Sequence, residues 1–348
     1  MFRAFGLYTH IRNNLMKSVI LLVGFPFVLP TVFFVLVFLG LTIFGQYQAF
    51  AIARNGSMFL FVVVIAVTAV WLPIAYFMNQ SIIDAATGAR ELTRSESPLV
   101  WNLLENLCIS RGVTMPALRV IETDARNAFA SGLKEGDYSV TVTRGLIDSL
   151  DKDELETVLA HELTHIRNRD VQLLVISTIL VGIVPMIHQL SVRGIWLLTS
   201  SLQNFYRGVF TILPMTGAKT LVTITYGLLF LIGKAVAYVF GTIGHFCSLL
   251  INFSLSRKRE FLADAGAIEL TKNPDALISA LRKIAGHSDI PTAIDGVREM
   301  CFDNPQITGL AGLLATHPPI EKRIEAIIRY GRDVAKNARR KRFSGQPP

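Results

Sequence analysis

Long apolar runs alternate with charged segments along the chain. The first two runs, Ser18 to Phe44 and Met58 to Met78, contain no acidic or basic residue, and each exceeds the roughly 20 residues that an α-helix needs to cross a bilayer. Val171 to Leu190 is a shorter third run, and Thr220 to Phe253 is a fourth that we interpret as one long helix emerging from the membrane. The pattern predicts a mainly α membrane protein with about four transmembrane helices.

Lys and Arg gather between these runs. Residues 79–170 and the region after Ser256 are rich in them, whereas the loop between the first two runs carries only Arg54. Because Lys and Arg favour the cytoplasmic side, we predict a multi-pass protein of the cell (inner) membrane with a split cytoplasmic α+β domain. The basic residues between 191 and 219 fit this topology poorly, so runs three and four could instead form a shallow or partly cytosolic hairpin.

The runs and the charges together divide the chain into five predicted parts. They are an N-terminal membrane hairpin (1–78), a first cytoplasmic part (79–170), a second membrane hairpin (171–255), a second cytoplasmic part (256–335) and a basic tail (336–348). Within the first cytoplasmic part, Ala117–Thr123, Asn127–Ser131 and Tyr138–Thr143 have the composition of short strands, with turn residues at 135–137. We expect these strands to form a small β-sheet among helices.

Composition supports the membrane interpretation. Hydrophobic residues make up 51% and charged residues 17% of the chain, whereas soluble domains are about a quarter charged. The net charge of +8 comes from residues that flank the apolar runs, so we expect a lipid surface as partner and no nucleic acid. The three cysteines are far apart and form no CxxC pattern, so they suggest neither a disulfide framework nor a cysteine zinc site. The first run is too long for a typical cleaved signal peptide.

One segment carries a recognisable chemical pattern. Asp151 begins a helical stretch with Glu154 three residues later, which is close to a capping box. Apolar residues recur along this stretch at helical spacing, and His161 and His165 lie four residues apart on the opposite face. Two imidazoles one turn apart on a rigid helix are suited to bind one zinc ion. We therefore predict zinc ligation by this His-Glu-Leu-Thr-His pattern, although such a pattern also arises by chance in charged helices.

Glu162 lies beside the two histidines and is predicted to act as a general base toward a zinc-activated water. A catalytic zinc has three protein ligands, and no third histidine follows soon after His165. Glu260 and Asp264, four residues apart in the segment after the fourth run, offer a third ligand and a carboxylate that orients a ligand histidine. The alternative is that these acids pair with Arg257 and Arg259 on a solvated helix face.

Four motifs, which follow one another along the chain in the family's order, resemble those of the membrane-integral gluzincins, a group of zinc metalloproteases that includes the bacterial HtpX-type proteases and the CAAX prenyl endoproteases. The motifs are His161-Glu-Leu-Thr-His165, Asn127-Ala-Phe-Ala-Ser-Gly132, Ser256-Arg-Lys-Arg-Glu260-Phe-Leu-Ala-Asp264, and His317-Pro-Pro with Arg323 beyond it. The four predicted runs are typical of the HtpX type, whereas the CAAX endoproteases have more membrane helices. The soluble part is thus expected to be a zinc-metalloprotease domain.

The resemblance implies roles that spacing alone does not. It implies that Glu260 is the third ligand of one Zn²⁺ per chain and that His317 stabilises the oxyanion of the reaction. It also implies that substrate is bound by Asn127, Ala128, Phe129, Ala130 and Arg323, with the peptide adding beside the strand. Without the resemblance, residues 127–130 are an ordinary short strand and His317-Pro-Pro is the entry of a helix.

These observations predict a zinc-dependent endopeptidase that cleaves membrane or misfolded proteins in protein quality control. The alternatives are a CAAX-type prenyl-protein endoprotease, a membrane metal transporter that uses the histidines as a transit site, and a catalytically silent scaffold. The segment 285–312, rich in Gly, Pro and Asp, is either a flap over the site or a plain linker. The sequence does not specify the substrate or the oligomeric state.

Overall fold

The computed structural model describes residues 7–43, 45, 47–179, 258–291, 297, 300–303 and 317–330, with single residues at 193, 197, 200, 201, 204 and 227. The chain divides into two compact units. The first unit comprises Met1–Leu22, Leu72–Ile179 and Asn252–Pro348, and the second comprises Val23–Trp71 and Leu180–Ile251. The candidate site lies within the first unit. The boundaries of the five predicted parts differ from those of these two units, and the division into five parts stays a prediction.

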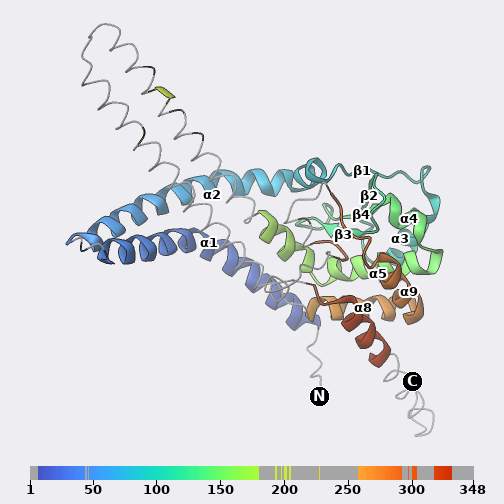
Figure 1. Cartoon of the computed structure of the whole chain (residues 1–348). Coiled ribbons are helices and arrows are strands. Elements are labelled where there is room, and N and C mark those ends of the chain that lie inside the picture. The colour runs from blue at the N-terminus through green and yellow to red at the C-terminus, as the bar shows by residue number, and fades with distance from the viewer. Residues whose placement is uncertain are drawn as a thin grey trace. The chain divides into compact units, whose positions relative to one another are not determined.

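A four-stranded sheet lies in the first unit, in the order β1-β2-β4-β3 (Figure 1). Its strands are β1 (Arg90–Glu91), β2 (Ala117–Ile121), β3 (Ala128–Ser131) and β4 (Ser139–Thr143). β2 and β4 are parallel, whereas β1–β2 and β3–β4 are antiparallel. Three strands match the predicted ones. β1 was not predicted because two exposed charged residues carry no strand pattern.

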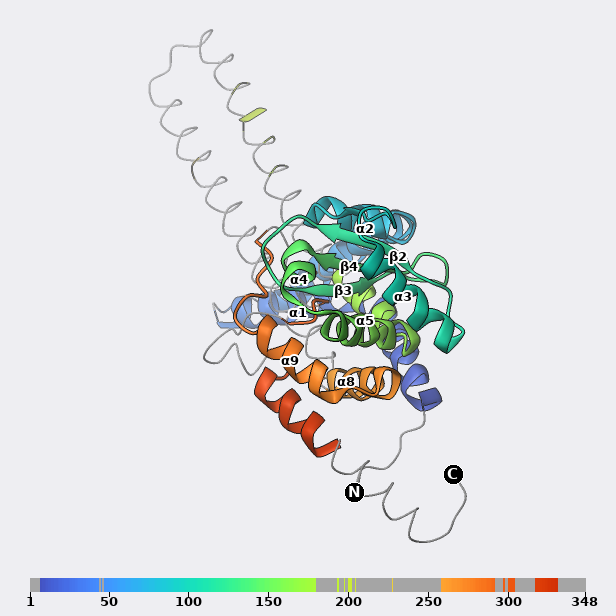
Figure 2. The same cartoon turned by 90° about the vertical axis from the view of Figure 1, so that its right-hand side faces the viewer.

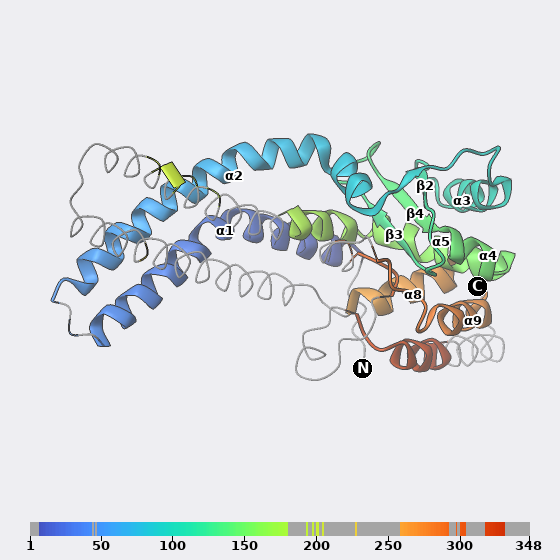
Figure 3. The ribbon, with the colours of Figure 1, turned by 45° about the horizontal axis from the view of Figure 1, so that its top comes forward.

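The helices of the first unit surround one central helix, α5 (Lys152–Arg167). α5 contacts β3 and β4 on one side and α8 and α9 on the other, and Figures 2 and 3 show it between the sheet and these two helices. The other described helices that lie wholly within this unit are α3 (Pro98–Arg111), α4 (Arg144–Ser149), Asp170–Ile179, α8 (Lys258–Thr271), α9 (Pro274–Ile284) and residues 320–330.

The sequence explains where α5 begins. The backbone N–H of Glu154 donates to Asp151 Oδ1 and the backbone N–H of Asp151 donates to Glu154 Oε2, each at 2.9 Å. This reciprocal pair is the predicted capping box. The predicted apolar stripe is buried, but so is the face that carries His161 and His165. α5 is therefore a core helix covered on both faces, not a helix with one open side.

Helices α1 (Leu7–Ile43) and α2 (Ala49–Thr87) contain the first two apolar runs, except for Phe44. Among the described residues, α2 is the one helix found long and apolar enough to cross a membrane. Residues 170–179 of the third run form a shorter apolar helix. The remainder of that run and nearly all of the fourth lie outside the described residues. The count of four spans therefore stays a prediction.

Within the second unit, α1 and α2 pack through aromatic side chains. The ring of Phe27 lies 5.1 Å from that of Phe61, and Phe34 and Phe50 meet edge to face at 5.7 Å. Other large apolar side chains of α2, including Phe59 and Val62, are more than half exposed. An apolar exterior of this kind is what a lipid environment favours.

Candidate metal centre

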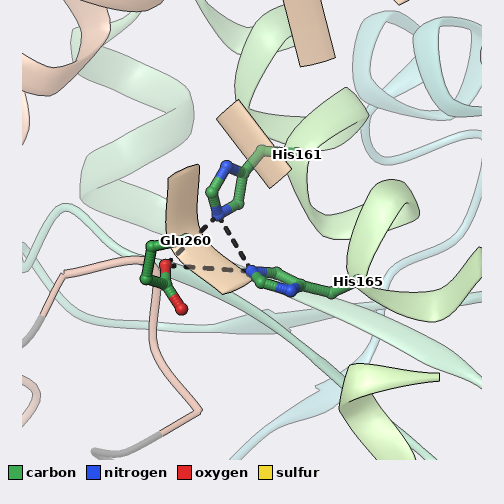
Figure 4. Close-up of side chains that lie close together, drawn as sticks. All are labelled: His161, His165 and Glu260. Atoms are coloured by element: carbon green, nitrogen blue, oxygen red, sulfur yellow. Dashed lines mark hydrogen bonds and ion pairs between the residues drawn. The ribbon is translucent and has the colours of Figure 1, made fainter. Parts of the chain in front are cut away.

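His161 and His165 point toward each other from successive turns of α5 (Figure 4). Their Nε2 atoms are 3.1 Å apart, and the ring planes are inclined by 83°. Both side chains are buried, and His161 is fully buried. The predicted i, i+4 pair therefore presents two imidazole nitrogens to one small space.

Glu260 of α8 brings a carboxylate to the same space (Figure 4). Its Oε2 lies 3.7 Å from Nε2 of His161 and 3.8 Å from Nε2 of His165. Oε2 is buried and accepts no hydrogen bond from the residues that the structure describes. Gly266 lets α8 approach α5, because a Cβ at this position would lie 2.5 Å from Cγ2 of Thr164.

The three atoms form a triangle that fits one metal ion, since they all lie within 4.8 Å of one another. A tetrahedral zinc with bonds of about 2.0–2.2 Å holds its ligand atoms about 3.3 Å apart. The observed edges of 3.1, 3.7 and 3.8 Å are close to that value. Two imidazoles and one carboxylate are also a donor set that a catalytic zinc uses, so the residues present fit this ion.

The surrounding charges favour a cation at this place. Burial opposes a charge on His165, but Glu260 and Asp170 outweigh that effect and raise the pKa of this imidazole to about 10. Burial alone would raise the pKa of Glu260, but the charges of His317 and His165 lower it well below its ordinary value. The negative potential that holds a proton on His165 would equally attract a divalent ion.

A carboxylate stands behind each histidine. Oδ1 of Asp264 lies 3.0 Å from Nδ1 of His161, which is the orienting contact predicted for Asp264. Oδ2 of Asp170 lies 3.0 Å from Nδ1 of His165. Asp170 was missed from the sequence, although an acid placed five residues beyond His165, at the end of the motif helix, was the available signal.

Arg323 neutralises Asp264 from the helix over residues 320–330. Its Nη2 and Nε donate to the two carboxylate oxygens at 2.6 and 3.0 Å, and Nη1 donates to the carbonyl of Phe302 at 2.8 Å. Burial would raise the pKa of Asp264, but Arg323 outweighs it and lowers that pKa. Arg323 is 1% exposed, so the structure assigns its donors to its own chain, and substrate contact stays a prediction.

Glu162 is buried beside the pair of histidines on α5, and 1% of its surface is exposed. Its Oε1 has no hydrogen-bond partner among the described residues. Burial raises the pKa of this carboxyl, while the charges of His161 and His165 act in the opposite direction. Such a carboxyl is able both to accept and to return a proton.

His317 lies close to the metal-ligand residues. Its Nδ1 is 3.5 Å from Oε2 of Glu260, and 9% of the residue is exposed. The structure therefore brings the predicted oxyanion-stabilising residue to the side of the site, together with the ligands. Its role in the reaction stays a prediction.

β3, the strand predicted to bind substrate, is an edge strand whose start is covered by residues 301–303. The side chain of Asn127 donates to the carbonyls of Ser288 and Asp303, both at 2.7 Å. The N–H of Phe302 donates to the carbonyl of Ala128 at 2.7 Å, and Cys301 forms an isolated antiparallel β-bridge with Phe129. Part of the 285–312 segment thus occupies the place where we predicted the peptide backbone. Ala130, which we also predicted to bind substrate, lies farther along β3.

The chain is similar to known proteins over most of its length. The model of Peptidase family M48 matches residues 95–330. A protease HtpX homolog of Bacteroides fragilis is 40% identical over 93% of this chain and 99% of its own length. A protease HtpX homolog of Listeria monocytogenes is 32% identical over 92% of this chain and 99% of its own length.

Among solved structures, the crystal structure of S. mikatae Ste24p aligns with a TM-score of 0.40 at 18% identity. The alignment covers 77% of this chain and 58% of that one, a likeness too remote to bear on function. The family match and the HtpX relatives confirm the resemblance that the four motifs predicted. With a family model matched over most of its length and relatives similar almost from end to end, this chain belongs to Peptidase family M48 and is a metallopeptidase.

Proposed function

We propose that this metallopeptidase is a zinc-dependent endopeptidase of the cell membrane that cleaves membrane or misfolded proteins, as part of protein quality control. The observation that carries the zinc assignment is the convergence of two imidazole nitrogens and one carboxylate oxygen beside the buried Glu162. His161, His165 and Glu260 would hold the ion. When bound, zinc would supply a Lewis acid that lowers the pKa of a water molecule and polarises the peptide carbonyl.

The chain's own residues supply the proton transfers. Glu162 has a buried oxygen without a hydrogen-bond partner among the described residues, so it can take a proton from the attacking water. The same carboxyl then returns the proton to the leaving amine. His317, whose Nδ1 lies 3.5 Å from Oε2 of Glu260, would donate a hydrogen bond to the substrate oxygen as negative charge develops on it.

The peptide would add to the outer edge of β3 by backbone hydrogen bonds. Because the carbonyl of Ala128 already accepts from Phe302, a peptide that pairs along the whole strand must displace residues 301–303. We therefore include this displacement in the proposed binding step. Asn127 would exchange its contacts with Ser288 and Asp303 for contacts with the peptide.

The membrane location rests on the apolar helix α2 and on the predicted spans. The Lys and Arg content of residues 79–170 supports a site that faces the cytoplasm. A metal transporter is less well supported, because the three candidate ligands lie on α5 and α8, outside the four apolar runs. Substrates are then expected to be proteins with segments in or near the bilayer.

The decisive experiment uses Glu162→Gln in the full-length protein. We expect the variant to retain one zinc per chain and to lose cleavage of an unfolded protein by about 10²–10⁴-fold, which is the usual contribution of general acid–base catalysis. Metal analysis and a fluorescent casein assay measure the two quantities. Cleavage by the variant at the wild-type rate would refute the role of Glu162.

The quality-control role is tested in cells. Membrane-protein fragments should accumulate when the wild-type protein is present and be absent with Glu162→Gln. If the fragments came only from soluble folded proteins, the proposed substrate class would be wrong. Products whose new C-terminus is a prenylated cysteine would instead favour the CAAX-type alternative.

A further inference from the structure

The two histidines of α5 are held by carboxylates of different origin. Asp264, which orients His161, comes from the motif that also contains Glu260. Asp170, which contacts His165, belongs to none of the four motifs. Asp170 is 1% exposed, so its charge is buried against the imidazole.

The backbone makes a sharp turn to place Asp170. α5 ends at Arg167, and Arg169 has a φ of 57°, a left-handed conformation that a residue with a side chain rarely adopts. A new helix starts immediately, at Asp170. Strained backbone of this kind persists where the surrounding structure requires it. Here it returns the carboxylate of Asp170 toward His165, one turn back on α5.

The second oxygen of Asp170 is bound by a residue far away in sequence. Nδ2 of Asn14, on α1, donates to Oδ1 of Asp170 at 2.7 Å and lies 3.3 Å from the carbonyl oxygen of Asn168. Asn14 is 5% exposed and belongs to the same compact unit as Asp170. A buried amide in an apolar helix is costly unless it is hydrogen-bonded, and this amide meets the carboxylate and the turn that carries it.

We propose that Asp170 is a positioning residue for His165 and that Asn14 in turn positions Asp170, so that α1 forms part of the metal centre. The inference rests on the proposed zinc function. Asn14 binds one carboxylate oxygen, which leaves the other directed at Nδ1 of His165. Nε2 of the same ring then faces Nε2 of His161 and Oε2 of Glu260. An outer contact of this type fixes the ring orientation and increases its basicity as a ligand.

The test measures zinc affinity of the full-length protein in detergent by competition with a graded chelator. We expect Asp170→Ala to weaken zinc binding by about 10–100-fold, as loss of an outer contact usually does. Asn14→Leu should weaken it by a smaller factor. The cobalt-substituted forms of both should have shifted absorption bands, because the ligand geometry changes.

The matched control is Ser18→Ala. Ser18 is buried one turn after Asn14 on α1, and its hydroxyl donates to the carbonyl of Asn14 in its own helix. The change therefore disturbs the same region of α1 without touching Asp170. We expect its zinc affinity and cobalt spectrum to match the wild type.

The double variant shows whether Asn14 acts through Asp170. If it does, Asn14→Leu combined with Asp170→Ala should bind zinc no more weakly than Asp170→Ala alone. Additive losses would overturn the proposal. So would an Asn14→Leu protein that melts at a lower temperature but keeps the wild-type zinc affinity and spectrum, because Asn14 would then serve only to hold α1 in place.

An exchange variant covers the case in which Asn14→Leu does not fold. Asn14→Asp together with Asp170→Asn keeps the buried amide–carboxylate hydrogen bond and the net charge, but moves the charge away from His165. We expect restored thermal stability with zinc binding still weakened, whereas recovery of wild-type zinc affinity would overturn the proposal. A wild-type protein that binds zinc without cleaving peptides would refute the proposed function alone, and one that binds no zinc would refute both.

Discussion

Helices α5 and α8 both supply metal ligands, but they differ in what holds the ligands in place. α5 begins with its own capping box and carries the two imidazoles of His161 and His165 and the carboxyl of Glu162. α8 buries Arg259, Glu260 and Asp264 close together. Each acid of α8 has a basic neighbour: Nε of Arg259 lies 3.1 Å from Oε1 of Glu260, and Arg323 binds Asp264.

The difference shows how each half of the site depends on the rest of the chain. Local hydrogen bonds between Asp151 and Glu154 cap the start of α5. The carboxylates of α8 are stable in the interior only while opposite charges remain beside them. One of these charges, Arg323, comes from a helix 59 residues later. The buried charge of Asp264 on α8 therefore depends on a contact that is distant in sequence.

The largest expected effect compares the same substitution on the two helices. Glu260→Gln on α8 removes a ligand charge and should reduce zinc affinity by more than the roughly 10–100-fold that an outer contact contributes. Glu162→Gln on α5 should leave zinc affinity nearly unchanged while cleavage is lost. Chelator competition measures the zinc affinity of both variants. Equal zinc affinities would contradict the assignment of Glu260 as a metal ligand and Glu162 as a base.

Arg323→Met should destabilise the metal-free protein by about 3–5 kcal/mol, because it leaves the carboxylate of Asp264 buried without its partner. Denaturant unfolding of the metal-free form measures the change without a contribution from zinc binding. Arg323→Met combined with Asp264→Asn is the control and should recover part of the loss. If the single variant were as stable as the wild type, the ion pair between Arg323 and Asp264 would not stabilise α8 as we infer.

Asp151→Ala should cost about 1 kcal/mol of stability, since it removes the side chain that caps α5. Lys152→Ala is the matched control, because Lys152 is an exposed neighbour in the first turn. The loss should be smaller than that of Arg323→Met. A loss as large as that of Arg323→Met would mean that α5 does not depend mainly on local contacts and packing.

The smallest expected effect is a pH dependence at the start of α5. Burial alone would raise the pKa of Glu154, but hydrogen bonds from Lys283 and Ser279 outweigh it and lower that pKa. The folded state therefore binds this proton less readily than the unfolded state, and the contribution to stability is lost as the pH falls through the lowered value. The stability difference between wild type and Glu154→Gln should shrink on acidification, and a growing difference would contradict the assignment.

Prediction from the sequence succeeded where short-range patterns decide the structure. The capping box of α5 formed as expected, and three strands lie within two residues of their predicted bounds. β1 was missed because it is a strand only by pairing with β2. The chain segment that covers β3 was undecided between flap and linker, since its contacts with Asn127 and Ala128 are long-range.

The sequence by itself determined the family and the geometry of His161 and His165, because four residues of helix place two side chains on one face whatever surrounds them. The resemblance implied Glu260 as third ligand, but the tertiary structure decided that its carboxylate oxygen faces those nitrogens and that Arg323 neutralises Asp264. It also decided that Asn14 reaches Asp170, 156 residues away. These contacts join segments that are far apart in the sequence, so no local pattern specifies them. They form only when the folded chain brings the buried polar and charged side chains together.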